Sequence, residues 1–167
     1  NLSQGQTYYY RITSVDTAGV ESGFSQSLQT RQSFVPGSVN LTGVTLSSLS
    51  WGDVDNDQDK DLIITGDNDN GTPVTKVYIN DGNGNFTAQN NSLPDVGNGD
   101  ISFSDFNRDG NLDLAIIGET ADNEVMMEVY VNDGTGNFSN INAEFDGVDE
   151  GAVDWGDYNG DRYPDVL

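Results

Sequence analysis

The chain has neither cysteine nor histidine among its 167 residues. Their absence excludes disulfide bonds, zinc sites built on thiolate or imidazole, and catalysis that depends on Cys or His. Basic residues are also scarce, because 6 Lys and Arg stand against 28 Asp and Glu, for a net charge of −22. Nucleic acid and anionic membranes are poor partners for such a surface, so we expect no nucleic acid. No apolar run reaches the about 18 residues of a membrane-spanning helix, and we expect no membrane insertion in this segment.

The acidic residues gather in three nine-residue loops of one pattern, at 53–61 (loop 1), 105–113 (loop 2) and 157–165 (loop 3). The period is 105 − 53 = 52 and again 157 − 105 = 52 residues. Positions 1, 3 and 5 offer side-chain oxygens, position 9 is always Asp, and position 7 varies, as expected of a residue that offers its backbone carbonyl. Alternating oxygen ligands in a tight turn suit a hard cation, above all calcium.

We therefore expect three Ca²⁺ sites, one per repeat loop. The candidate ligands are Asp53, Asp55, Asp57, Asp59 and Asp61 in loop 1, Asp105, Asn107, Asp109, Asn111 and Asp113 in loop 2, and Asp157, Asn159, Asp161, Tyr163 and Asp165 in loop 3. Three bound ions would change the net charge from −22 to −22 + 6 = −16.

The loops have two other possible interpretations. Asp, Asn and Gly dominate ordinary solvated turns, but one pattern repeated three times at one period disfavours that explanation. The helix-loop-helix calcium hand needs Glu at position 12 and helices on both sides. Position 12 is Ile64 in loop 1 and Ile116 in loop 2, and both lie in short apolar segments that predict buried strands. The helical hand is therefore rejected.

Position 6 differs between the loops. Loop 2 has Gly110 there, where a sharp turn often needs positive φ, whereas Gln58 and Arg162 hold this position in loops 1 and 3. We expect similar sites with unequal affinities.

The repeat extends beyond the loops. Two apolar positions with a two-residue spacing precede each loop and mark the inward face of a strand. Apolar segments that end in Asn-Asp-Gly, at 80–82 and 132–134, predict hairpins. Each unit is thus strand, acidic loop, strand, variable connection, strand, Gly-rich hairpin and strand, which is typical of a propeller blade. The inward pairs are Leu49 and Trp51, Ile101 and Phe103, and Val153 and Trp155.

These features resemble the FG-GAP or VCBS repeats of integrin alpha-chain propellers and of many secreted microbial proteins. The resemblance rests on Asp-x-(Asp/Asn)-x-Asp-x-x-x-Asp before an apolar strand, and on Tyr-(Ile/Val)-Asn-Asp-Gly-x-Gly-Asn-Phe. It covers about residues 40–167 and implies that each loop joins the first two strands of a blade and binds calcium through the matched positions. Gln58 and Arg162 depart from the family's common Gly, which questions the detailed loop geometry and not the cation.

Residues 1–31 follow another pattern, with apolar residues alternating from Leu2 to Ile12. They look like the last strands of a fibronectin type III sandwich in which Tyr8 forms the tyrosine corner. The alternative is a strand pair that caps the propeller. Residues 32–40, which include Pro36 and Gly37, are the expected linker.

The predicted fold class is all-β. It comprises the C-terminal part of a fibronectin type III-like domain at 1–31 and an incomplete β-propeller at 41–167, with two full 52-residue periods of four-stranded blades and part of a third. The chain opens without a basic and apolar leader, which fits a segment of a longer protein. We expect the rest of the same polypeptide, or a partner chain, to complete both modules.

We expect a non-enzymatic, calcium-stabilised binding or adhesion module of a secreted or cell-surface protein, because extracellular calcium fills sites of modest affinity. Its ligand would be a protein or a glycan, recognised by the variable connections at 67–76 and 119–128. The alternatives are a lectin-like propeller and an accessory domain of a secreted polysaccharide-active enzyme. Every clustered carboxylate belongs to a cation loop, so no catalytic pair is evident. The repeat-locked Trp51, Phe103 and Trp155 are expected to serve in core packing and not in sugar stacking.

Overall fold

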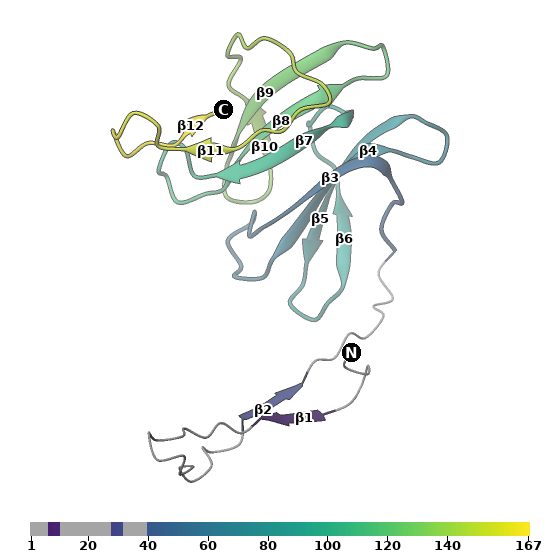
Figure 1. Cartoon of the computed structure of the whole chain (residues 1–167), viewed down its shortest axis with the longest axis vertical. Coiled ribbons are helices and arrows are strands. Elements are labelled where there is room, and N and C mark those ends of the chain that lie inside the picture. The colour runs from purple at the N-terminus through teal and green to yellow at the C-terminus, as the bar shows by residue number, and fades with distance from the viewer. Residues whose placement is uncertain (1–6, 11–27, 32–39) are drawn as a thin grey trace, which may run out of the picture. The chain divides into compact units, whose positions relative to one another are not determined.

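The computed structural model describes residues 7–10, 28–31 and 40–167, and this part of the chain is all-β (Figure 1). The chain divides into two compact units, residues 1–38 and 39–167. In the first unit, β1 (Thr7–Tyr10) pairs antiparallel with β2 (Leu28–Arg31), and Tyr8 lies opposite Thr30. The other residues of the sandwich pattern, and the linker apart from Asn40, lie outside the described residues. The sandwich and the capping pair both contain such a strand pair, so the sandwich stays a prediction.

Two four-stranded antiparallel sheets form most of the second unit, each with its strands in chain order. Sheet 1 consists of β3 (Thr45–Gly52), β4 (Asp61–Asp67), β5 (Pro73–Asn80) and β6 (Phe86–Gln89). Sheet 2 consists of β7 (Gly97–Ser104), β8 (Asp113–Glu119), β9 (Val125–Asn132) and β10 (Phe138–Asn140). A further pair, β11 (Trp155–Gly156) and β12 (Asp165–Val166), repeats the start of this arrangement. The predicted order of strands, acidic loops and hairpins is confirmed, and closure into a propeller stays a prediction.

The strand that follows each acidic loop is the most buried part of its sheet. In β4 and in β8, the first six residues are all buried. A continuous apolar run suits a strand that is covered on both faces. Strand β7 packs against β3 and β4, so the two sheets lie beside each other (Figure 1). They share one hydrophobic core, to which Val54 and Ile63 contribute from the first repeat and Leu114 and Ile116 from the second.

Each sheet has the same irregularity in its first strand. The register between β7 and β8 shifts between Gly97 and Asp100, and β3 has the equivalent shift against β4. Gly118 lies opposite this bulge with φ +147°, and a Cβ there would lie 2.7 Å from the carbonyl oxygen of Gly97. Backbone therefore occupies the space that a side chain would need.

The predicted inward face of the first strand is correct in the later repeats and wrong in the first. Ile101 and Val153 are each only 4% exposed, whereas Leu49 and Trp51 are 59% and 54% exposed. The physical reason is the neighbouring sheet. Strand β7 packs against sheet 1, whereas no sheet in the described residues of this unit covers the face of β3 that carries Leu49 and Trp51. The Trp51 and Phe86 rings meet in an edge-to-face arrangement, with ring centroids 6.0 Å apart.

Candidate metal centres

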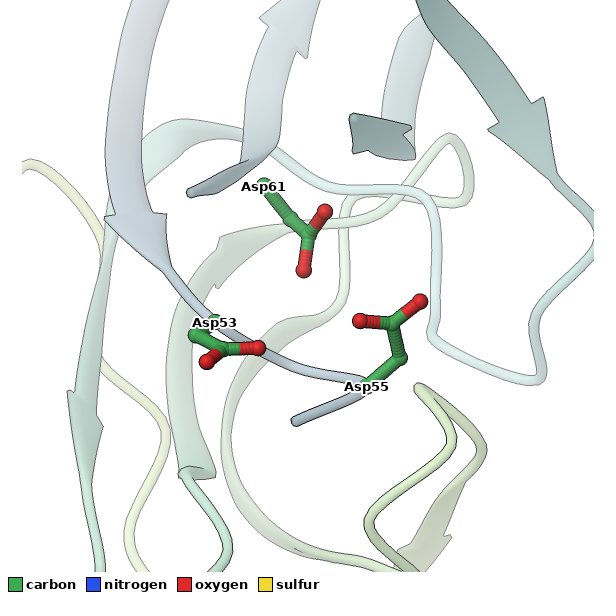
Figure 2. Close-up of side chains that lie close together, drawn as sticks. All are labelled: Asp53, Asp55 and Asp61. Atoms are coloured by element: carbon green, nitrogen blue, oxygen red, sulfur yellow. The ribbon is translucent and has the colours of Figure 1, made fainter. Parts of the chain in front are cut away.

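Loop 1 brings three carboxylates together at the junction of β3 and β4. One oxygen from each of Asp53, Asp55 and Asp61 lies within 4.8 Å of the others. Figure 2 shows the three side chains converging from the two sides of the loop, Asp61 from the start of β4 and the other two from the segment after β3. The carboxylates of Asp57 and Asp59 do not belong to this group.

The first residue of each loop holds the turn through its carboxylate. Asp53 accepts hydrogen bonds from the backbone N–H of Asp57 and of Gln58, at 3.1 and 3.0 Å. Asp105 accepts the equivalent pair from positions 5 and 6 of loop 2, at 3.0 and 3.1 Å. Asp157 accepts from Arg162 at 2.8 Å and from Gly160 at 2.7 Å. In each loop the first carboxylate thus holds a tight turn, as a cation loop requires.

All three loops have the same backbone geometry at position 6. Its φ is +94° at Gly110, +78° at Gln58 and +76° at Arg162. The departures from Gly therefore do not alter the turn, although a residue with a Cβ is strained in this region. Position 4 also has positive φ in every loop, at Asn56, Arg108 and Gly160.

Position 3 separates loop 1 from the other loops. It is Asn107 in loop 2 and Asn159 in loop 3, so these loops carry one carboxylate fewer at this point. Each Asn amide donates to the carboxylate at position 5, Asn107 to Asp109 at 3.0 Å and Asn159 to Asp161 at 3.1 Å. Within the described residues, loops 2 and 3 form no cluster of three acidic side chains comparable to that of loop 1. Their amide oxygens are also ligands that calcium accepts.

The Asp at position 9 is the most buried ligand candidate. Asp61 and Asp113 both have no exposed surface. Asp61 accepts backbone hydrogen bonds from Val54 at 2.8 Å and from Asn80 at 2.9 Å, while Asp113 Oδ1 accepts one from Asn132 at 3.0 Å. Asp113 Oδ2 is buried without a hydrogen-bond partner in the described part of the chain.

Burial is also the main electrostatic influence on these carboxyls. It raises the pKa of Asp61 and of Asp113, because the charged form loses contact with water. The pKa of Asp55 is raised by burial first, and then by the negative charges of Asp61 and Asp57. A cation beside these groups would favour their ionised forms, and at Asp113 it would also satisfy the unpartnered oxygen. The donors present therefore fit a calcium ion.

The side chains at position 7 are turned toward neighbouring structure. In loop 1, the carboxylate of Asp59 lies against Gly82 in the hairpin of its own sheet, and in loop 2, the amide of Asn111 lies against Gly134. In loop 3, the ring of Tyr163 lies 5.3 Å from the guanidinium carbon of Arg108.

Three asparagines beside the loops were not singled out by the sequence. The side-chain amide of Asn132 donates to the carbonyl of Val54 in loop 1, at 2.8 Å, and that of Asn80 to the carbonyl of Lys60, at 3.0 Å. The Asn of each Asn-Asp-Gly segment thus supports an acidic loop in addition to forming its hairpin. Asn56 in loop 1 donates to Asn111 in loop 2, at 2.8 Å. The Asn before Asp-Gly, repeated 52 residues later, was the only available signal, and turn chemistry alone explained it.

Comparison with known proteins finds a repeat whose boundaries coincide with the acidic loops. A family model described as an FG-GAP-like repeat matches residues 53–116 and 105–167, and each match begins at the first residue of an acidic loop. The chain belongs to the FG-GAP-like repeat family. FG-GAP repeats are a non-catalytic module that often binds calcium and is typical of extracellular proteins. The comparisons with curated proteins and with solved structures gave no match. In the part of this FG-GAP chain that is described, no helix is long and apolar enough to cross a membrane.

Proposed function

We propose that this FG-GAP segment is a calcium-stabilised binding or adhesion module of a larger secreted or cell-surface protein, and that it is not itself an enzyme. The observation that carries the calcium assignment is Asp113, whose second carboxylate oxygen is buried and unpartnered at the end of loop 2. An unpaired buried carboxylate oxygen is costly, and a metal ion removes that cost. The convergent carboxylates of loop 1 support the same assignment in the first repeat.

Calcium would act at the junction of two strands. Positions 1, 3, 5 and 9 would hold it through side-chain oxygens and position 7 through its backbone carbonyl, one ion per loop. Asp53 follows the end of β3 and Asp61 begins β4, so a shared ion ties these strands together. Binding to the folded state alone stabilises it by about 2.7 kcal/mol when free calcium is 100 times Kd. Sites of modest affinity would fill outside the cell.

The exposed face of β3 supports an incomplete arrangement of sheets. Leu49 and Trp51 are exposed there, while Ile101 and Phe103, their equivalents in β7, pack into the shared core beside sheet 1. Uncovered large apolar side chains at a position that is packed in the next repeat indicate a surface that another sheet covers. We propose that this sheet is a further blade, supplied by the same polypeptide or by a partner chain, in a calcium-binding propeller.

The ligand of the module would bind where the repeats differ. A pocket of about 130 Å³ lies between the variable connections of the two sheets, lined by Asp67 and Pro73 from the first and by Glu119 and Asn123 from the second. Its lining is polar and acidic and contains no aromatic side chain. The pocket suits amine or hydroxyl groups of a protein or glycan ligand. This pocket offers no ring for a sugar to stack on, so it does not favour the lectin-like alternative.

Thermal unfolding of the full 167-residue chain, with calcium and after removal of metal, tests the calcium assignment. We expect a higher Tm with calcium, by about 2 to 4 °C for each kcal/mol of binding stabilisation. Asp113→Asn should reduce this difference. Asp122→Asn, which removes the same charge from an exposed turn, should retain it. Identical Tm values for the native chain in both conditions would falsify structural calcium.

A further inference from the structure

A contact between neighbouring acidic loops recurs at the period of the repeat. Asn56 at position 4 of loop 1 donates from its amide to Asn111 Oδ1 at position 7 of loop 2, at 2.8 Å. One period later, 56 + 52 = 108 and 111 + 52 = 163, and Arg108 of loop 2 lies over the ring of Tyr163 of loop 3, 5.3 Å from its centroid. The chemistry changes from a hydrogen bond to a cation–π contact, but the two positions in contact remain the same.

A second connection between loops 1 and 2 runs through a buried residue. Asn132 is 1% exposed, and its amide donates to the carbonyls of Val54 in loop 1 and of Leu112 in loop 2, at 2.8 and 3.1 Å. Its backbone N–H donates to Asp113, the last ligand candidate of loop 2. One side chain thus fixes the backbone beside the first ligands of loop 1 and beside the last ligand of loop 2.

We propose that the acidic loops of neighbouring repeats bind calcium cooperatively, so that occupancy of one loop raises the affinity of the next. The proposal rests on the calcium sites of the proposed function. Asn56 lies between the ligand candidates Asp55 and Asp57, so an ion in loop 1 holds its side chain where it meets Asn111. Ordering Asn111 in advance lowers the entropic cost of placing its carbonyl on an ion in loop 2. Linkage makes the effect reciprocal.

Charge alone acts in the opposite direction. An ion in loop 1 reduces the negative potential that attracts a second ion to loop 2, and this effect weakens with salt. Cooperativity must therefore come from the side-chain contacts. The chain itself suggests a substitution that removes one of them without straining the turn, because loop 3 has Gly160 at position 4 with φ +79°. Asn56→Gly deletes the amide that reaches Asn111 and keeps a residue suited to positive φ.

A matched control exists two residues later. Gln58 also has positive φ, at +78°, its equivalent in loop 2 is Gly110, and its side chain makes no hydrogen bond to another repeat in the described residues. Gln58→Gly therefore loosens the same loop to a similar degree without removing the cross-repeat contact. Both substitutions leave the charge of loop 1 unchanged, so electrostatic effects cancel when the two variants are compared.

The test measures the affinity of loop 2 with loop 1 active or inactivated by Asp53→Asn and Asp55→Asn together. The amide of Gly110, followed by NMR during a calcium titration of the full chain, reports loop 2. We expect inactivation of loop 1 to weaken binding at loop 2 about fivefold in the native and Gln58→Gly chains, and less than twofold in the Asn56→Gly chain.

The outcomes separate this proposal from the one on which it rests. If Gly110 responds to calcium but inactivation of loop 1 changes its affinity equally in the Asn56→Gly and Gln58→Gly chains, or not at all, the loops are not coupled through Asn56 and the calcium sites stand. If Gly110 responds in none of the chains, loop 2 binds no calcium and both proposals are wrong.

Discussion

The side-chain amide of Asn132 donates a 2.8 Å hydrogen bond to the carbonyl oxygen of Val54, 78 residues earlier in the chain. Both residues are buried. The bond connects the last residue of β9 in sheet 2 to the acidic loop of sheet 1. Asn80 is the equivalent residue of the first repeat, and its described side-chain bonds stay within sheet 1 and its loops. The same amino acid in the same hairpin thus has an additional role wherever a preceding sheet is present.

This difference predicts unequal effects of two matched substitutions. Asn132→Ala should lower the free energy of unfolding by about 3 kcal/mol, because it leaves several buried backbone groups without partners. Asn80→Ala, which disrupts more exposed bonds, should cost about 1 kcal/mol. Urea unfolding in the presence of calcium measures both. Equal losses would show that the bond to Val54 contributes nothing.

The bulge in β7 leads to a prediction for a second pair of substitutions, Gly118→Ala and Gly43→Ala. Gly118→Ala should destabilise the chain by about 1 to 3 kcal/mol, because Ala is strained at φ +147° and its Cβ would meet the carbonyl oxygen of Gly97. Gly43→Ala is the control, since a Cβ there has no atom within 4 Å. The measurement is the unfolding midpoint of each variant compared with that of the native chain. An unchanged midpoint for Gly118→Ala would contradict the bulge geometry.

Asp113 predicts opposite effects with and without metal. In calcium, Asp113→Asn should lower Tm because a ligand loses its charge. Without metal it should leave Tm unchanged or raise it, because burial already disfavours the carboxylate and the substitution removes that charge. Calorimetry of the native and Asp113→Asn chains, with calcium and without metal, shows whether the chain with the higher Tm is a different one in the two conditions. A loss of the same size with and without metal would mean that Asp113 serves packing alone.

The hairpin of sheet 2 should contribute to stability in a way that depends on pH in the acid range. Hydrogen bonds from the side chains of Thr135 and then Asn137 lower the pKa of Asp133 to about 2, from an ordinary 3.8. Because this pKa is lower in the folded state, the stabilisation is complete above the unfolded value and is lost as the pH falls through about 2. Thr135→Val should raise the NMR titration midpoint of Asp133. The midpoint of Asp81, whose pKa is lowered by Asn85 in the other hairpin, should not change.

The sequence predicts the elements of this fold well because each leaves a local signal. The period of 52 residues aligns the acidic loops, the apolar runs of β4 and β8 and the Asn-Asp-Gly hairpins, and the structure has all of them in that order. The errors of the sequence-based prediction concern which elements pack beside one another. Trp51 occupies the same register position as Phe103, and only the presence or absence of a neighbouring sheet makes one exposed and the other packed.

The loops show the same division between local and non-local information. Asp and Asn at alternate positions are readable from the sequence, whereas the positive φ of Gln58 and Arg162 is not, because these side chains normally avoid it. Position 4 carries Asn56, Arg108 and Gly160, which share no chemistry. Their common backbone geometry, and the contact that the first two make with the next loop, become visible only when the sheets are placed side by side.

A crystal structure of the full chain grown with calcium, with the ions located by anomalous scattering, would show whether the acidic loops hold calcium. We expect one peak in each acidic loop, with the oxygens of positions 1, 3, 5, 7 and 9 at about 2.3 to 2.6 Å and Asp113 Oδ2 among them. Ordered loops without ions at millimolar calcium, with only water or a protein donor beside Asp113 Oδ2, would contradict it.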